Sequence, residues 1–312
     1  MTPMPESCEL CGHSGAKVPL YRDRGIVRCP GCGLVAYDGV AEVEQLYTGA
    51  YFAGGEYHDY VADKPMLQRN FRHRIAEMRR LMPRGQLLEI GAAHGFFLEL
   101  AQHHWRVRGL EIAAPAAAYA REVTGVEVER ADFLHQPEQP NSCDLICMWD
   151  TVEHLVHPVR VIEKAARWLR PGGYLALTTG NIASAVARLR KGRWRLIHPP
   201  THLYYFSPET LGRAVTQAGL QVVRVRSVGY VRSYRSMVSQ LLMQGRARHP
   251  LLYNLATLGG RLDLPVYLNL GDIMMLIARK PSPRGSRGAV RGMTPPESPD
   301  GRKALPCPPP RT

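Results

Sequence analysis

Residues Leu87–Leu100 read LLEIGAAHGFFLEL, in which an apolar run ends at a glycine and gives way to a helical pattern. The two glycines of this stretch, Gly91 and Gly95, lie four residues apart. Glycine permits a backbone conformation that Cβ disfavours, and it lets a ligand approach the amides that open the next helix. The stretch therefore predicts a strand, a ligand-binding loop and a helix, with the carboxylate of Glu89 just ahead of the loop.

Short apolar runs of strand type alternate with helical patterns through the rest of this region. The expected strands are Gln86–Gly91, Val107–Ile112, Val126–Ala131, Asp144–Trp149, Tyr174–Thr179, Gln221–Val228 and Ile273–Ala278. The expected helices are Phe96–His104, Ala114–Val123, His157–Leu169 and Pro208–Ala218. Regular alternation implies right-handed crossovers and a parallel sheet with helices on both faces. We therefore predict an α/β fold with a Rossmann-like, doubly wound, mostly parallel seven-stranded sheet.

Two acidic residues follow the glycine loop at strand ends. Glu111 ends the second expected strand, twenty residues after Gly91, where a carboxylate can accept hydrogen bonds from both hydroxyls of a ribose. Asp132 ends the third expected strand, where it can accept from an adenine amino group beside Phe133. The dinucleotide fingerprint G-x-G-x-x-G is absent, because residues 91–96 read GAAHGF. The pattern favours a ligand with a ribose and an adenine, bound without a pyrophosphate cradle.

Five motifs in this order resemble the class I S-adenosylmethionine-dependent methyltransferases. The motifs are LLEIGAAHGFFLELAQ, GLEIA, ADF, CDLICMWDTVEHLVHP and WLRPGGYLALTTGN, and the resemblance covers about residues 85–280. It implies S-adenosylmethionine as cofactor, with Glu89 holding the methionine ammonium directly or through water. The implied cofactor-binding residues are Glu89, Gly91, Ala92, Gly95, Phe96, Glu111, Ile112, Asp132, Phe133, Trp149 and Asp150. One departure is Ala93, where the family most often has glycine.

Four cysteines near the N-terminus are spaced as metal ligands. Cys8-x2-Cys11 and Cys29-x2-Cys32 are separated by 17 residues, as in structural zinc sites. Four thiolates form a closed, tetrahedral site with no open position for catalysis. Disulfides are the competing interpretation, but the first residues lack the pattern of a signal peptide and no apolar stretch has the length of a membrane span. We therefore expect a reducing, cytoplasmic location and a small zinc-ribbon-like module over residues 1–40.

The residues after the fourth expected strand bear on the type of acceptor. Asp150-Thr151-Val152-Glu153-His154 stands where base-methylating enzymes usually have an N-P-P-Y type run, and this disfavours N-methylation of nucleobases. The EH pair resembles that of quinone-pathway O-methyltransferases and of deoxysugar C-methyltransferases.

A later segment, HPPTHLYYFSPETL, resembles the EHxxYFS segment of the sugar enzymes, whose histidine serves as a base. The resemblance implies that His202 is the first candidate for the catalytic base and His154 the second. For each of them, a structural histidine held by hydrogen bonds is the alternative. Thr201 stands where the sugar enzymes have glutamate, which puts transfer to carbon in doubt.

The formal charge of +13 is concentrated in one part of the chain. Residues 184–250 contain twelve Lys and Arg and a single acid, Glu209. Such a field attracts phosphates on a nucleotide, a lipid surface or RNA. We expect contact with a phosphate or a peripheral membrane contact through this basic segment, and a solvated basic face is the alternative.

Composition separates four regions along the chain. Residues 1–40 form the zinc module, and residues 41–84 hold the aromatic stretch LYTGAYFAGGEYHDY and a helix. The aromatic stretch is expected to be a lid over the site or a packing seam between domains. Residues 85–280 form the methyltransferase domain. Residues 281–312 contain nine prolines and no aromatic residue, which predicts a disordered tail rich in proline and arginine.

The sequence thus predicts a zinc-containing enzyme that transfers a methyl group from S-adenosylmethionine to a hydroxyl, or a carbon, of its acceptor. The acceptor classes that fit are a small molecule, a glycan, a nucleotide-sugar or a quinone-like molecule, any of which can be lipid-linked. One alternative is an RNA methyltransferase that uses the zinc module and the basic segment, although nucleic acid is the less favoured partner. The other is a non-catalytic scaffold that binds the cofactor.

Overall fold

The computed structural model describes residues 2–3, 5–41, 60–243, 249–259 and 264–282. Most of the aromatic stretch, with Tyr47, Tyr51, Phe52 and Tyr57, lies outside the described residues, as does the tail beyond residue 282. Among the described residues, no helix is long and apolar enough to cross a lipid bilayer.

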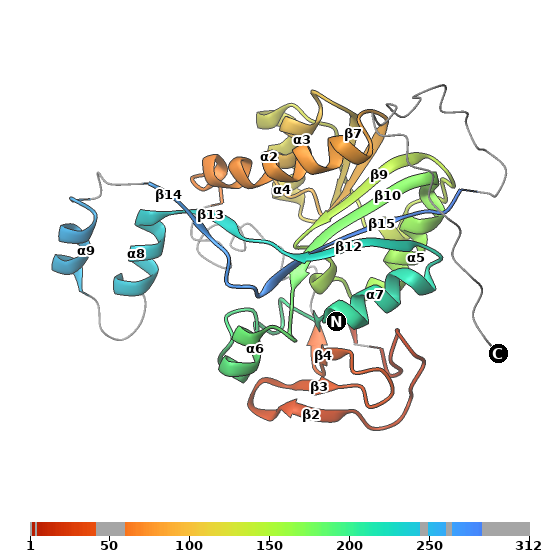
Figure 1. The fold of residues 1–312 in the computed structure, drawn as a ribbon, viewed down its shortest axis with the longest axis horizontal. Coiled ribbons are helices and arrows are strands. Elements are labelled where there is room, and N and C mark those ends of the chain that lie inside the picture. Colours follow the sequence, from red (N-terminus) through yellow and green to blue (C-terminus); the bar gives the residue numbers. More distant parts are fainter. Residues whose placement is uncertain (1, 4, 42–59, 244–248, 260–263, 283–312) are drawn as a thin grey trace, which may run out of the picture. The chain divides into compact units, whose positions relative to one another are not determined.

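A seven-stranded sheet forms the centre of the fold (Figure 1). Its strands are β6 (Gln86–Ile90), β7 (Arg106–Glu111), β8 (Val128–Arg130), β9 (Cys143–Trp149), β10 (Leu169–Gly180), β12 (Gln221–Ser227) and β15 (Ile273–Arg279). The order across the sheet is β12-β15-β10-β9-β6-β7-β8. β15 is antiparallel to both of its neighbours, and the other adjacent pairs are parallel. The predicted α/β fold with a mostly parallel seven-stranded sheet is confirmed.

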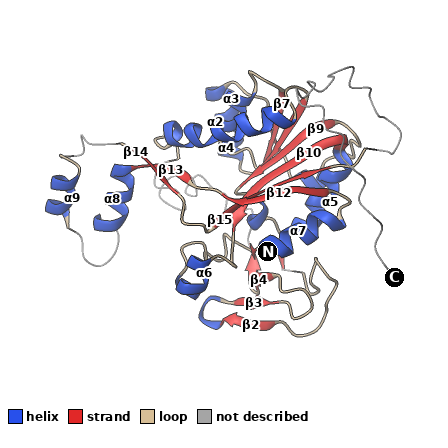
Figure 2. Cartoon of the chain, viewed as in Figure 1, coloured by secondary structure: helices blue, strands red, loops and turns tan. Residues whose placement is uncertain are grey.

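Helices cover both faces of this sheet (Figure 2). One face carries α2 (Lys64–Leu81), α3 (Phe96–Ala101) and α4 (Ala114–Tyr119), and the other carries α5 (Pro158–Trp168) and α7 (Pro208–Gln217). Successive strand residues point to opposite faces, so Leu145 packs in the cluster under α2 whereas Ile146 packs in the cluster under α5. Two helices are shorter than predicted: α3 stops before His104, and a wider turn over Ala120–Thr124 replaces the end of α4.

The N-terminal module has a sheet of its own, which includes a strand from much later in the chain. β2 (Val18–Tyr21), β3 (Ile26–Arg28), β4 (Val35–Tyr37) and β11 (Tyr204–Tyr205) are arranged in the order β11-β4-β3-β2. A short helix, α6 (Ala185–Arg190), precedes β11, and a separate pair joins β1 (Thr2–Pro3) to β5 (Val40–Ala41). The amide of Tyr37 donates to the carbonyl of Leu203 at 2.8 Å. The cysteine-containing segment is thereby tied to the chain that follows His202.

Between β12 and β15 the chain forms a helical insertion, Tyr230–Leu268, that the sequence pattern did not predict. β13 (Tyr230–Ser233) pairs antiparallel with β14 (Pro265–Leu268), and α8 (Tyr234–Met243) and α9 (Pro250–Ala256) lie between them in the chain. Asn70 of α2 fixes β13 by two hydrogen bonds. Its Nδ2 donates to the carbonyl of Val231 at 3.1 Å, and its Oδ1 accepts from the Val231 amide at 2.7 Å.

Part of the basic segment is neutralised within the fold. Arg195 pairs at 3.1 Å with Asp272, a carboxylate that is 2% exposed. Arg224 and Arg226 of β12 both pair with Glu77 of α2. These three of the twelve predicted cations hold elements together, so the free positive field is smaller than the sequence indicated.

Candidate active site

A pocket opens at the carboxyl ends of β6, β7 and β9, where sheets of this kind bind their ligands. Ten of the eleven predicted cofactor-binding residues line it: Glu89, Gly91, Ala92, Phe96, Glu111, Ile112, Asp132, Phe133, Trp149 and Asp150. Gly95 does not line the pocket. The fold thus brings together, from successive strand ends, nearly all the residues that the resemblance implied.

The two glycines after β6 have the left-handed backbone that the sequence indicated, but they serve different purposes. Gly91 has φ +76°, and a Cβ there would lie 2.5 Å from the Thr151 Cγ2. Gly95 has φ +75°, and a Cβ there would lie 2.6 Å from the Val126 Cγ2. Gly91 therefore shapes the pocket itself. Gly95 lets the loop pack against Val126, whereas its contact with a ligand stays a prediction.

Glu111 holds the glycine loop in place. Its Oε2 accepts from the amide of Ala93 at 2.8 Å, and its Oε1 accepts from the amide of Ala113 at 2.8 Å. Ala93 has φ +45°, a left-handed conformation that costs a residue with a Cβ roughly 1–2 kcal/mol, and the hydrogen bond offsets part of this cost. Burial raises the pKa of Glu111, while its backbone hydrogen bonds act in the opposite direction. The carboxylate lines the pocket in a fixed orientation, where the sequence predicted a ribose contact.

Asp132 and Phe133 form the wall of the pocket after β8. The Asp132 Oδ1 accepts from the amide of Leu134 at 2.8 Å, and its Oδ2 lies 3.2 Å from the Nδ1 of His135. The carboxylate therefore caps the short helix Phe133–His135. A contact between Asp132 and adenine stays a prediction.

Two buried polar atoms of the pocket have no hydrogen-bond partner in the part of the chain that the structure describes. They are Oε2 of Glu89 and Nε1 of Trp149, on side chains that are 3% and 6% exposed. Burial raises the pKa of Glu89 well above its usual value, although nearby Arg74 opposes the shift. A buried polar group without a partner costs about 1–3 kcal/mol. An unpaired acceptor and an unpaired donor in one pocket match the ammonium and the carboxylate of an amino acid.

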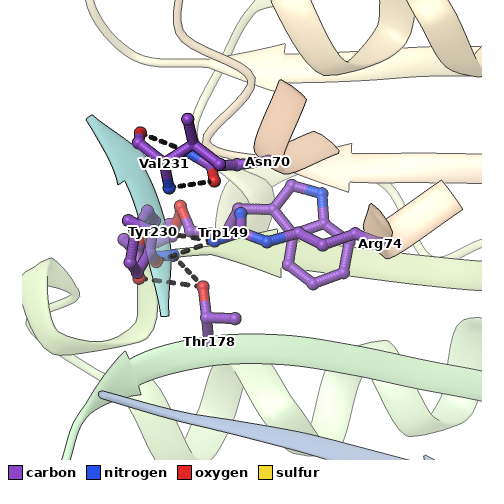
Figure 3. Close-up of polar contacts among 8 residues, drawn as sticks. Asn70, Arg74, Trp149, Thr178, Tyr230 and Val231 are labelled. Carbon is purple, nitrogen blue, oxygen red and sulfur yellow. Dashed lines mark hydrogen bonds and ion pairs between the residues drawn. The ribbon is translucent and has the colours of Figure 1, made fainter. Parts of the chain in front are cut away.

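Asp150 is held by a polar network that the sequence did not indicate. Its partners Thr178 and Tyr230, together with Arg74, are drawn in Figure 3. Its Oδ1 accepts from the Thr178 hydroxyl at 2.8 Å, and its Oδ2 accepts from the Tyr230 hydroxyl at 2.5 Å. The Tyr230 oxygen in turn accepts from Nη2 of Arg74 at 2.7 Å. Arg74 is buried, and its guanidinium lies over the ring of Trp149, 4.8 Å from the ring centroid. α2 and the helical insertion thus fix the positions of two lining residues, Asp150 and Trp149.

Aromatic side chains form the wall beside the glycine loop. Tyr60, at the end of the aromatic stretch, is buried and stacks on Phe96 with ring centroids 5.4 Å apart. Phe71 of α2 meets Phe97 edge-on at 5.5 Å, and all four rings line the pocket. The sequence identified Phe96 as a contact but missed Phe71 and Phe97, because apolar residues in helices look alike whether they line a pocket or fill a core.

The two candidate catalytic histidines lie side by side, and of the two His154 lines the pocket. Their ring centroids are 4.7 Å apart and the rings are nearly perpendicular, at 89°. The Nδ1 of His154 lies 2.9 Å from the carbonyl of Thr201, and the Nδ1 of His202 lies 2.9 Å from the carbonyl of Leu196. A carbonyl oxygen can only accept, so in the neutral rings each Nδ1 carries the proton and each Nε2 the lone pair. His202, the first candidate from the sequence, is 6% exposed and does not line the pocket.

The four N-terminal cysteines converge on one point. The Sγ atoms of Cys8 and Cys32 are 3.5 Å apart, as are those of Cys11 and Cys29, and all four lie within 4.8 Å of one another without a disulfide. Sulfurs at 2.3 Å from a tetrahedral zinc ion are about 3.8 Å apart, so the donor set fits this metal. Burial opposes ionisation of Cys29, but hydrogen bonds from the backbone of Cys32 and Gly31 and from neighbouring thiols lower its pKa to about 7. Burial raises the pKa of Cys8 and of Cys32, so only part of the donor set favours the thiolate before a metal binds.

Residues 64–225, more than half of the chain, match the model of a family described as methyltransferase domain. The chain belongs to this family. It is a class I S-adenosylmethionine-dependent methyltransferase, as the five motifs implied.

The chain is also similar to individual methyltransferases. The chain is 24% identical over 162 residues to the ubiquinone biosynthesis O-methyltransferase of Burkholderia pseudomallei, covering 48% of this chain and 70% of that one. It is 29% identical over 158 residues to the protein of the same name from Xanthomonas euvesicatoria, covering 46% and 66%. A solved SAM-dependent methyltransferase from Archaeoglobus fulgidus has a TM-score of 0.50 and 15% identity, covering 71% of this chain and 99% of that one, and it has the same fold.

Proposed function

We propose that this methyltransferase transfers the methyl group to a hydroxyl oxygen of a small, partly apolar acceptor such as a quinone-like ring. The observation that carries the proposal is the place of His154, which lines the same pocket as the cofactor-binding residues. The wall next to it is apolar, with Leu155, Val156 and Val161. The similarity to ubiquinone biosynthesis O-methyltransferases supports an acceptor of this class.

On the cofactor side, S-adenosylmethionine supplies an electrophilic methyl group on its sulfonium centre. Glu89 accepts from the ammonium, and Nε1 of Trp149 donates to the carboxylate, which gives partners to two buried atoms. Glu111 accepts from the ribose hydroxyls, and Asp132 and Phe133 bind the adenine at the wall after β8. Arg74 and Tyr230 do not line the pocket; they act as positioning residues through Asp150 and Trp149.

On the acceptor side, the hydroxyl must lose its proton as the new bond forms. We assign activation of the hydroxyl to the pair of His154 and His202, with His154 at the pocket and His202 in support. General-base activation typically contributes about 10²–10⁴-fold to the rate. Transfer to carbon is less supported, because Thr201 offers a hydroxyl where the sugar enzymes have a carboxylate, and this hydroxyl lies 3.2 Å from the Nδ1 of His198.

The Cys8, Cys11, Cys29 and Cys32 cluster is proposed to hold a structural zinc ion. The spacing in the sequence and the Sγ separations support this assignment. With four thiolate ligands the ion has no open position. Its contribution is to the fold of the N-terminal module and, through the pairing of β4 with β11, to the chain beside His202.

The acceptor class is tested with labelled S-adenosylmethionine and three acceptors: a catechol-type phenol with an apolar tail, a nucleotide-sugar and RNA. We expect label in the phenol, loss of labelling in Glu89→Gln, and normal labelling in the control Glu122→Gln, which changes an exposed acid. Label in RNA, with affinity falling steeply as salt is raised, would instead support the RNA methyltransferase. Cofactor binding without transfer to any component of a cell extract would support a scaffold.

A further inference from the structure

We propose that Glu153, His154 and His202 form a second metal site, for a divalent cation such as Zn²⁺, at the acceptor side of the pocket. Their ligand atoms, a carboxylate oxygen and two imidazole nitrogens, all lie within 4.8 Å of one another. Metal–ligand bonds to these atoms are about 2.0–2.2 Å long, so ligand atoms around one ion are roughly 3–4 Å apart. Small rotations of the three side chains therefore close the set around an ion.

The hydrogen bonds of the two histidines are those that metal ligands make. In metal sites, the ring nitrogen that does not bind the ion usually donates to a carbonyl or a carboxylate, which fixes the tautomer and the orientation of the ring. His154 and His202 each donate from Nδ1 to a backbone carbonyl, of Thr201 and of Leu196 respectively, at 2.9 Å. In each ring the Nε2 therefore carries the lone pair that a metal ligand needs.

Backbone hydrogen bonding fixes the relative positions of the two segments that carry the three ligands. Glu153 and His154 belong to the short helix Val152–His154 after β9, and His202 belongs to the turn before β11. The amide of Leu203 donates to the carbonyl of Glu153 at 2.8 Å, so the two segments are joined at the ligands themselves. Glu153 and His202 are buried, at 5% and 6% exposure, which shields the site on the side away from the pocket.

Two imidazoles and one carboxylate leave a coordination position open, unlike the closed set of four cysteines. Because His154 lines the pocket, the hydroxyl of an acceptor can take this position. With the ion bound, the two histidines act as its ligands and not as the general base: the cation lowers the pKa of the hydroxyl, and the proton leaves to water. The oxygen then bonds to the methyl carbon as the sulfur–methyl bond breaks and its electron pair returns to sulfur. This role rests on the proposed function, whereas the binding of the ion does not.

The site is tested first by metal binding, without any activity assay. Co²⁺ is added stepwise to the full chain with zinc in its cysteine site, and the visible spectrum is recorded. We expect one further equivalent to bind, with ligand-field bands but no thiolate charge-transfer bands. Glu153→Gln and His202→Gln should each weaken Co²⁺ binding by roughly 10–100-fold. His198→Gln is the matched control, because it changes an exposed histidine outside the set.

Circular dichroism and S-adenosylmethionine affinity check that each variant folds. Absence of Co²⁺ binding beyond the cysteine site, or binding that persists in both variants, overturns the second metal site. Binding as expected without methylation of any hydroxyl acceptor leaves the metal site standing and refutes the proposed function. Methylation at the full rate by protein freed of the second ion overturns the catalytic role of the ion.

The helical insertion carries exposed leucines on its second helix, α9. Leu251, Leu255 and Leu258 are 83%, 75% and 63% exposed and are spaced to share one side of α9 and the turn after it. Of the five arginines in residues 230–271, Arg232 and Arg235 belong to the described part and are exposed, and the sequence of this segment has a single acid, Asp263. Apolar side chains within a basic segment suit an anionic lipid surface, where leucines enter the interface and arginines meet the headgroups. We infer that the insertion docks this enzyme on such a surface.

The lipid surface is tested by flotation with vesicles of phosphatidylcholine, with and without phosphatidylglycerol. We expect binding to the anionic vesicles that weakens with salt, and a loss of about tenfold or more in Leu251→Gln with Leu255→Gln, because each leucine contributes about 1.5–3 kcal/mol when buried. Val123→Gln, at a residue 60% exposed elsewhere, is the control. Equal binding by wild type and the double variant overturns the inference. So does self-association that the double variant abolishes, which would show a second copy of the chain on the leucines.

Discussion

Tyr204 pairs with Ala36, and this pairing of β11 with β4 joins the N-terminal module to the chain beside His202. Tyr204 lies two residues after His202, and the intervening Leu203 donates its amide to the carbonyl of Glu153 at 2.8 Å. One stretch of chain thus joins the sheet of the module to the short helix Val152–His154, whose last residue lines the pocket. The closed cysteine site can therefore affect catalysis by positioning His202, although it does not touch the cofactor pocket.

Loss of the zinc ion proposed for the four cysteines should impair turnover more than cofactor binding. Cys8→Ser with Cys11→Ser removes two of the four ligands, and a small module that depends on metal for its folding should lose its structure. The cofactor pocket lies on the central sheet, so S-adenosylmethionine affinity should persist while turnover falls on the order of tenfold or more, because alignment of reacting groups carries much of the rate. Metal analysis gives the zinc content, calorimetry gives the S-adenosylmethionine affinity, and a methyl-transfer assay gives the turnover. Cys307→Ser is the control, because Cys307 is not one of the four proposed ligands. Full zinc content in the double variant would refute the ligand assignment.

Glu111→Ala should weaken S-adenosylmethionine binding by tenfold or more. Hydrogen bonds to a charged group contribute about 1.5–3 kcal/mol each, and 1.4 kcal/mol is tenfold in affinity. The carboxylate also accepts from the amides of Ala93 and Ala113, so the free energy of unfolding should fall by about 1–3 kcal/mol as well. Titration calorimetry and urea unfolding measure the two effects. Asp132→Ala should cost less affinity, and an unchanged affinity in Glu111→Ala would reject the ribose contact.

Tyr230→Phe should destabilise the protein by about 1–3 kcal/mol, because it removes the hydroxyl between Arg74 and Asp150 and leaves buried polar groups without this partner. S-adenosylmethionine affinity should also fall, since Asp150 and Trp149 lose their support. Tyr234→Phe is the matched control, because its hydroxyl bonds only weakly, at 3.4 Å, to a carbonyl outside the network. Chemical unfolding gives the free energy of unfolding of both variants. Equal values for the two would contradict a stabilising role of the network.

S-adenosylmethionine affinity should depend on the ionisation of Glu89. Burial raises the pKa of this carboxyl well above its usual value in the unliganded protein, whereas the cofactor ammonium binds the ionised form. The affinity should therefore fall as the pH is lowered through the raised pKa, and binding near that pH should release a proton. The number of protons released on binding is measured by titration calorimetry in buffers of different ionisation enthalpy. In Glu89→Gln this release should vanish, and its persistence would assign the proton to another group.

The strand, loop and helix around Gly91 could be predicted because their signals are local in the sequence. Glu111 and Asp132 could be predicted too, because carboxyl ends of adjacent parallel strands meet at one edge of a sheet. Arg74 and Tyr230 could not, since they are 156 residues apart and meet only where β13 packs on α2. The two-residue strand β11 could not be predicted either, because so short a run shows no alternation, and its partner β4 lies in the N-terminal module.

Methylation of a hydroxyl is tested most directly by identifying the atom that receives the methyl group. Wild-type protein is incubated with S-adenosylmethionine carrying a carbon-13 methyl group and a catechol-type acceptor, and the product is examined by carbon–proton correlation NMR. We predict one new signal, from a methyl group bonded to oxygen, and no such signal with Glu89→Gln. A methyl group bonded to carbon or nitrogen, or no transfer by protein that binds the cofactor normally, would contradict the proposed reaction.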